Sequence, residues 1–180
     1  YVEAETGHKM RSSIIFFGSI LGRFKEGKVP YPGGCRIGAR PIDLHLKAFR
    51  KMGVEVYEEN EEINFKAEKI QGTEINLDYP SVGATENIML AAVLAKGTTT
   101  IYNCAREPEI EGLQEFLNSM GAKIKGAGTD IIVIEGVEKL HSAHYKAIPD
   151  RIEAGTYMIG AAITGGEIYI KNAKKDIMIQ

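Results

Sequence analysis

The feature that most constrains this 180-residue sequence is a pattern of about seventy residues that occurs twice and begins a third time. Each copy contains a helical pattern, a short strand, a second helical pattern and two alternating segments. The third copy begins at Ala154, where GTYMIGAAITGGEIYIKNA matches TENIMLAAVLAKGTTTIYNCA with one gap. This alternation of helices and strands predicts an α/β fold built from similar units.

The first copy begins with a helical pattern. Apolar residues at Met10, Ile14, Phe17, Leu21 and Phe24 follow the spacing of one helix face. The other elements expected in this copy are a strand at 28–31, a helix with Pro41 at its first position and Gly53 at its end, and a hairpin of strands 54–57 and 63–67.

The second copy follows the same plan. Its expected elements are a strand at 74–77, a helix at 84–95, a strand at 98–102, a helix from Pro108 to Gly121, and a hairpin of strands 122–125 and 130–135. The repeating unit is therefore β-α-β-α-β-β when the strand at 74–77 is included. The pattern does not decide whether the helices lie inside and the sheets outside, or the reverse.

The chain divides near Pro149, where it leaves the second hairpin. We expect a first domain at 1–149 with two repeat units and the beginning of the next unit at 150–180. Because the sequence begins at Tyr1 and stops just after a strand-like run, we expect a fragment that lacks an N-terminal unit and part of a second domain.

Composition argues against several classes of protein. A net charge of −2 gives no electrostatic reason to expect nucleic acid or a membrane surface as a partner. The longest apolar run, Ile14–Leu21, is interrupted and too short to span a bilayer. The two cysteines form no disulfide framework, which favours a reducing, cytoplasmic location.

The two complete copies differ most in the connection from strand to second helix. This connection is longer in the first copy, and the extra residues carry Cys35 within YPGGCRIGARP. The segments that repeat usually form the scaffold, whereas functional residues often lie in the loop that differs between the copies. Arg36 and Arg40 would favour the thiolate of Cys35, and Arg40 precedes a helix N-terminus that favours anions. These features predict a reactive thiol and a small anionic ligand.

Less specific interpretations remain open for these residues. A cysteine between glycines and arginines is often only part of a surface loop. The loop lacks the Gly-Lys-Ser/Thr of a phosphate-binding loop, and no second cysteine or histidine stands close enough for a metal site. We expect His45 to be a structural residue and Cys104 to be buried. Arg151 either pairs with Asp150 or faces a ligand cleft.

Four motifs point to a known family. PGGCRIGARPIDLH, PSVGATENIMLAA, AREPEI and PDRIEAGT occur in order, and together they resemble the UDP-N-acetylglucosamine 1-carboxyvinyltransferase family over most of the chain. The resemblance implies an inside-out α/β barrel of β-α-β-α-β-β units in each of two domains, of which this chain holds part. It also implies transfer of enolpyruvyl from phosphoenolpyruvate to the 3-hydroxyl of UDP-N-acetylglucosamine, with release of phosphate.

That reaction is the first committed step of peptidoglycan precursor synthesis, so the resemblance links the chain to cell-wall biogenesis, cell shape, the cell cycle and cell division. It implies no metal and no organic cofactor. It makes Cys35 the general acid toward phosphoenolpyruvate and the residue that fosfomycin alkylates. The other site residues that it implies are Arg40 and Arg11 for phosphoenolpyruvate, and Arg40, Pro41, Ile42, Asp43, Leu44, Ser81, Val82 and Gly83 for the nucleotide sugar. We add Arg151 as a substrate-binding residue.

The sequence also departs from the family. Tyr79-Pro80 stands where some members have a lysine, which puts the nucleotide contacts there in question. A Lys-Asn pair, a catalytic aspartate and a late arginine of the family are absent, so we expect the remainder of its own chain to be a partner and the fragment alone to be inactive. Two rivals stay open: a 5-enolpyruvylshikimate-3-phosphate synthase-like transferase, which lacks a cysteine loop, and a non-catalytic repeat module.

Overall fold

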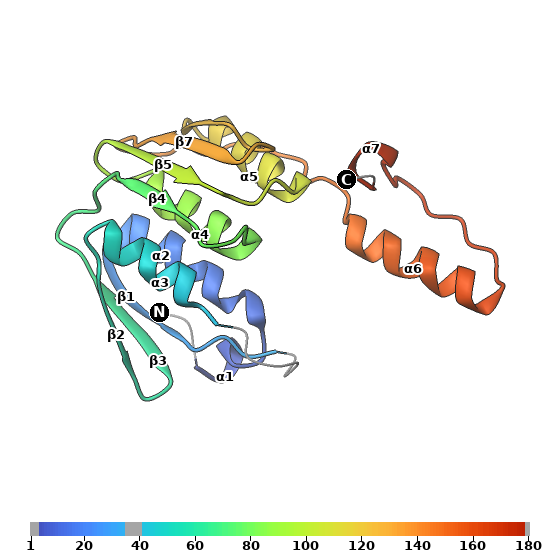
Figure 1. Ribbon diagram of the computed structural model, residues 1–180, viewed down its shortest axis with the longest axis horizontal. Coiled ribbons are helices and arrows are strands. Elements are labelled where there is room, and N and C mark those ends of the chain that lie inside the picture. Colours follow the sequence, from blue (N-terminus) through green and yellow to red (C-terminus); the bar gives the residue numbers. More distant parts are fainter. Residues whose placement is uncertain (1–3, 35–40, 179–180) are drawn as a thin grey trace. The chain divides into compact units, whose positions relative to one another are not determined.

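The computed structural model describes residues 4–34 and 41–178. The chain forms two compact units, Tyr1–His144 and Tyr145–Gln180. Cys35 and Arg40, two of the predicted site residues, lie outside the described residues. The elements of the first unit, shown in Figure 1, are α1 (Ala4–Gly7), the 3-10 helix η1 (Arg11–Ile14), α2 (Ile15–Phe24), β1 (Glu26–Pro30), α3 (Asp43–Lys51), β2 (Glu55–Glu59), β3 (Glu62–Lys66), β4 (Glu74–Asn76), α4 (Val82–Ala92), β5 (Thr98–Tyr102), α5 (Pro108–Ser119), β6 (Lys123–Lys125) and β7 (Ile131–Glu135).

The helix predicted over 10–24 forms in two pieces, η1 and α2. Phe17 and Leu21 are fully buried, as the pattern predicts. Met10 and Phe24, at the two ends of the predicted helix face, are 42% and 62% exposed. Met10 has an extended backbone before η1 and is not part of the helix, whereas Phe24 is the last residue of α2.

The helix expected to begin at Pro41 begins two residues later, at Asp43. Ile42 has a non-helical backbone, with φ −113° and ψ 12°, and is the N-cap residue. Pro41 therefore lies in the connection before α3 rather than in its first turn. Leu46 and Phe49 of α3 are buried.

The first sheet has the strand order β1-β3-β2, and both strand pairs are antiparallel. The predicted hairpin is confirmed as β2 and β3. Its turn residues Asn60 and Glu61 have φ values of 51° and 61°. Two successive left-handed residues give the twist that matches the strands of a two-residue hairpin.

The second sheet has the order β4-β5-β7-β6. β4 and β5 are parallel and are connected through α4, whereas β7 is antiparallel to both β5 and β6. Ile75, Ile101 and Ile132 occupy paired positions and are buried. The order β4-α4-β5-α5-β6-β7 is the predicted β-α-β-α-β-β unit.

Helices α2, α3 and α4 lie between the two sheets, as Figure 1 shows. Alternate residues of β7 are exposed, so that sheet turns one face to the helices and the other to solvent. At the centre of the first unit, the Phe17 ring lies 4.4 Å from that of Phe49 and 4.1 Å from that of Phe65. The sequence repeat did not decide whether the helices or the sheets lie inside. The family resemblance implied that the helices lie inside, and this is the arrangement found.

The second unit contains α6 (Arg151–Thr164) and α7 (Lys175–Met178). Residues 167–171, which the repeat aligns with β5, form no strand. In the first unit β5 pairs with β4 and β7, and the described residues of the second unit provide no strand that could take the place of either. A strand without a pairing partner leaves its backbone groups to water.

Across the described residues, no helix combines the length and the apolar content that a membrane span needs.

Candidate functional site

A cavity of about 540 Å³ lies where η1, α3 and the N-terminus of α4 come together. Its lining residues are Arg11, Ser12, Ile14, Ile15, Pro41, Leu44, His45, Tyr79, Ser81, Gly83 and Glu86. The fold therefore gathers predicted site residues from three distant segments of the sequence. These are Arg11, Pro41, Leu44, Ser81 and Gly83.

A larger cavity of about 1040 Å³ lies beside α3 and the β2–β3 hairpin. Two more predicted residues, Ile42 and Asp43, line it, together with Lys47. Arg11 and Pro41 line both cavities. These two residues mark the wall that the cavities share.

Two of the predicted site residues that the structure describes, Val82 and Arg151, line neither cavity. Val82 is partly buried and packs against the hydrophobic core at the start of α4. Arg151 is the first residue of α6, in the second unit. Cys35 and Arg40 lie outside the described residues. The chemical roles of all the site residues remain predictions.

Arg11 supplies a cation to the cavity wall. It begins η1, and its Nη2 donates a hydrogen bond to the carbonyl oxygen of Pro41, 3.4 Å away. That bond joins the segment before α2 to the segment before α3. A guanidinium at this place presents several N–H donors that suit a carboxylate or a phosphate.

The N-terminus of α4 faces the same cavity. Ser81 is the N-cap residue of this helix, and its Oγ accepts a hydrogen bond from the Ala84 N–H at 3.4 Å. The remaining N–H groups of the first turn and the helix dipole favour negative charge. Together with Arg11, this end of α4 makes the cavity suited to an anionic ligand.

His45 is a buried histidine on the cavity wall, only 5% exposed. Burial and the Arg11 cation lower its pKa to about 4, and Asp43 has a smaller effect that raises it. The ring is therefore neutral at pH 7. The prediction of a structural histidine fits its burial, but sequence reasoning missed its place in the cavity. Its position in the first turn of the helix that follows Pro41 was the available signal.

Glu86 was also missed by sequence reasoning. It follows Gly83 by three residues on α4, so both lie on the same helix face and line the cavity. Burial and the nearby Glu109 raise the pKa of the Glu86 carboxyl. Tyr79, which stands where some family members have a lysine, lines the cavity as well.

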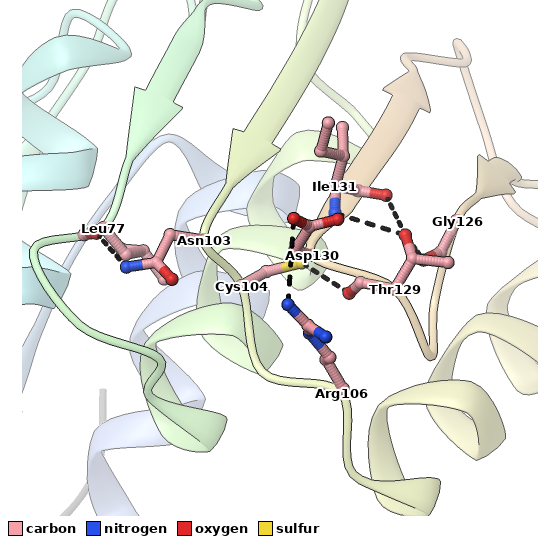
Figure 2. Close-up of polar contacts among 8 residues, drawn as sticks. All are labelled: Leu77, Asn103, Cys104, Arg106, Gly126, Thr129, Asp130 and Ile131. Carbon is pink, nitrogen blue, oxygen red and sulfur yellow. Dashed lines mark hydrogen bonds and ion pairs between the residues drawn. The ribbon is translucent and has the colours of Figure 1, made fainter.

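Cys104 is a buried scaffold residue, as predicted. Its Sγ lies 3.3 Å from the Thr129 carbonyl oxygen, to which it donates (Figure 2). Next to it, Arg106 and Asp130 form an ion pair at 3.7 Å. Burial raises the pKa of the Cys104 thiol, which keeps it protonated and poorly nucleophilic. Cys104 therefore has no features of a reactive cysteine.

Comparison with known proteins identifies relatives over nearly the whole chain. The family model described as EPSP synthase (3-phosphoshikimate 1-carboxyvinyltransferase) matches residues 2–179. UDP-N-acetylglucosamine 1-carboxyvinyltransferase 1 of Carboxydothermus hydrogenoformans is 59% identical over 169 residues, which are 94% of this chain and 40% of that protein. UDP-N-acetylglucosamine 1-carboxyvinyltransferase 2 of Caldanaerobacter subterraneus subsp. tengcongensis is 59% identical over 93% of this chain and 40% of its own length. The chain thus spans about two fifths of these curated relatives.

Solved structures share the fold at lower identity. The enolpyruvyl transferase NikO from Streptomyces tendae superimposes with a TM-score of 0.73 at 23% identity, covering 88% of this chain and 38% of that one. An EPSP synthase from Acinetobacter baumannii superimposes with a TM-score of 0.63 at 24% identity, covering 85% of this chain and 35% of that one. The expected fold class, as part of a larger fold, is confirmed.

Proposed function

This chain belongs to the EPSP synthase (3-phosphoshikimate 1-carboxyvinyltransferase) family, and from that premise we propose that it is part of a UDP-N-acetylglucosamine 1-carboxyvinyltransferase. The complete protein would transfer enolpyruvyl from phosphoenolpyruvate to the 3-hydroxyl of UDP-N-acetylglucosamine and release phosphate. The observation that carries the proposal is the 59% identity to relatives of that name over 94% of the chain.

The alternative, a 5-enolpyruvylshikimate-3-phosphate synthase-like activity, has weaker support. The family model carries the EPSP synthase name, but the solved EPSP synthase from Acinetobacter baumannii is only 24% identical. The connection with Cys35 also argues against it, since that enzyme lacks a cysteine loop. A non-catalytic repeat module would not require an anion-suited cavity lined by Arg11.

In the proposed site, Arg11 and Arg40 bind the acidic groups of phosphoenolpyruvate and neutralise the departing phosphate. Cys35 delivers a proton to the methylene carbon, and fosfomycin would alkylate it. The segments Pro41–Leu44 and Ser81–Gly83 hold the nucleotide sugar. The support for this arrangement is that Arg11, Pro41 and Ser81 line one cavity. Arg151 would complete the substrate contacts.

The partner that completes the site is the remainder of the same protein. Because the chain spans 40% of its relatives, we expect no turnover from the 180 residues alone. In the cell, the complete enzyme would act in the cytoplasm and supply peptidoglycan precursors, which links it to cell shape and division.

Alkylation by fosfomycin in the presence of UDP-N-acetylglucosamine tests the proposal. Peptide mass spectrometry should find rapid modification of Cys35 and none of Cys104, whose thiol is buried. The Cys35→Ser variant should lose the modification, whereas Cys104→Ser should retain it. Equal, slow labelling of both cysteines would favour the non-catalytic module. If 3-phosphoshikimate protected Cys35 from alkylation, and the alkylation did not depend on UDP-N-acetylglucosamine, the alternative transferase would be favoured.

A further inference from the structure

The carboxamide of Asn87 in α4 is fully buried and bonds the backbone of α2. Its Oδ1 accepts from the Gly18 N–H at 2.6 Å, and its Nδ2 donates to the Ile14 carbonyl oxygen at 2.9 Å. A backbone N–H can only donate and a carbonyl can only accept. These two partners therefore fix which end of the amide is oxygen and which is nitrogen.

The second hydrogen of Nδ2 is directed at His45. The Asn87 Nδ2 and the His45 Nδ1 are 2.9 Å apart. Because Nδ2 is a donor, Nδ1 must accept, and the proton of the neutral ring is then on Nε2. If Nδ1 of His45 were also protonated, two N–H donors, Nδ1 and the Asn87 Nδ2, would face each other. This contact therefore also disfavours the imidazolium form of His45.

The Nε2 edge of the ring faces the cavity at Gly83. A Cβ atom on Gly83 would lie 3.5 Å from His45 Cε1 and 3.8 Å from Nε2. His45 is 5% exposed, and within the described residues no hydrogen-bond acceptor for Nε2 is found. An N–H donor on a cavity wall without a protein acceptor is suited to bind a ligand atom.

The groups around His45 are mixed in charge. Arg11 of η1 and Asp43 of α3 act on the ring electrostatically, and Glu86 of α4 lines the same cavity. The cation and the N-terminus of α4 favour an anion beside the Nε2–H. A fixed neutral donor adds a directed hydrogen bond to that attraction without adding charge.

We propose that Asn87 is a positioning residue that holds His45 as a neutral Nε2–H donor directed at the anionic group of a ligand in this cavity. Asn87 touches no ligand itself and acts through His45. The proposal rests on the proposed function only in identifying that ligand as a nucleoside diphosphate. The orientation of the ring proton is a separate property of the chain and is measured separately.

Nitrogen-15 NMR of the 180-residue chain with labelled histidine tests the tautomer. In the wild-type chain, His45 should carry its proton on Nε2 and not on Nδ1 at neutral pH. In the isosteric Asn87→Asp variant, the carboxylate can only accept, so the proton should move to Nδ1 or the ring should become doubly protonated. A wild-type ring protonated on Nδ1 would overturn the proposal, even if the variant failed to fold.

Asn118→Asp is the matched control. Asn118 also bridges backbone groups, accepting from the Ile124 N–H and donating to the Ile124 carbonyl oxygen at 2.9 Å each. Its substitution should leave the His45 tautomer unchanged. If Asn87→Asp also left the tautomer unchanged, Asn87 would not be the residue that sets it.

Titration with uridine diphosphate separates this proposal from the proposed function. In the wild-type chain, the nucleotide should shift the His45 Nε2–H resonance, and in Asn87→Asp the shift should be lost. If the wild-type ring had the predicted tautomer but its resonance did not shift with uridine diphosphate, the result would count against the nucleotide site. The role of Asn87 in positioning His45 would still stand. An equal response in both proteins would support the nucleotide site and overturn the positioning role.

Discussion

Gly18 and Asn87 bring helices α2 and α4 into close contact. A Cβ atom on Gly18 would lie 2.2 Å from the Asn87 carbonyl oxygen and 2.5 Å from its Oδ1. Both atoms belong to groups with little freedom to move, since one is backbone and the other is hydrogen-bonded to Gly18 itself. The absence of a side chain at Gly18 is therefore a requirement of the α2–α4 contact and of the cavity wall that it supports.

Replacing Gly18 with alanine should destabilise the first unit. Alanine favours helix by about 1 kcal/mol relative to glycine, but overpacking of this kind typically costs about 1–3 kcal/mol. We expect the overpacking to dominate and to lower the free energy of unfolding by about 1–2 kcal/mol. Chemical denaturation followed by circular dichroism measures the change.

Gly160→Ala is the control, because Gly160 lies in α6 and a Cβ atom there would meet nothing within 4 Å. This variant should not lose stability. A similar loss in both variants would mean that the effect is not caused by the contact with Asn87.

The pH dependence of stability should show the buried His45. Its pKa is 6.5 in the unfolded chain and about 4 in the folded one. Between these values the unfolded chain binds more protons, so the free energy of unfolding should fall as the pH is lowered from 6.5 toward 4. The loss is on the order of 3 kcal/mol, because each pKa unit corresponds to about 1.4 kcal/mol.

Denaturation at a series of pH values should show this fall in the wild-type chain and a smaller one in His45→Gln. His144, which is exposed, provides the comparison. His144→Gln should keep the wild-type slope. Retention of the full slope in His45→Gln would assign the effect to other groups.

Local conformation was predictable from the sequence where it depends on neighbouring residues only. The repeat aligns Asn103 with Asn172, and both have left-handed backbones, with φ values of 55° and 63°. Asparagine tolerates that region, so the same left-handed conformation forms in both units. The strand before Asn103 forms as β5, but its counterpart before Asn172 does not, because a strand also needs a distant partner.

The candidate site was predictable to the same limited extent. Motif resemblance identified Arg11 and Ser81, and the fold places both on one cavity. It did not identify His45 or Glu86, because their role depends on how three helices pack. Periodicity assigns a residue to a helix face but does not show whether that face meets a core or a cavity.

Glu86 should oppose folding at neutral pH. Its pKa is raised by burial and by Glu109, so the folded chain binds its proton more tightly than the unfolded chain does. The contribution of this group to stability is therefore present at low pH and lost as the pH rises above 4.5. Glu86→Gln should abolish that loss and make the chain more stable than wild type at pH 7.

Glu111→Gln, in the exposed part of the first turn of α5, removes the same charge without touching the cavity. Thermal unfolding of both variants at pH 4 and pH 7 separates the effects. Equal stabilisation by both would indicate a general effect of net charge rather than the burial of Glu86.

Asp150 should stabilise α6 as its N-cap. Its Oδ1 accepts hydrogen bonds from the N–H groups of Ile152 and Glu153, at 2.9 and 3.0 Å. Asp150→Ala should cost about 1 kcal/mol, and Asp150→Ser, which keeps an acceptor, should cost less. Amide hydrogen exchange across 152–156 measures the change as faster exchange in the alanine variant. The Arg151→Gln variant distinguishes the N-cap from an ion pair between Asp150 and Arg151. If amide exchange in Arg151→Gln were as fast as in Asp150→Ala, the ion pair would be the source of the stability. If exchange stayed near the wild-type rate, the N-cap would be the source.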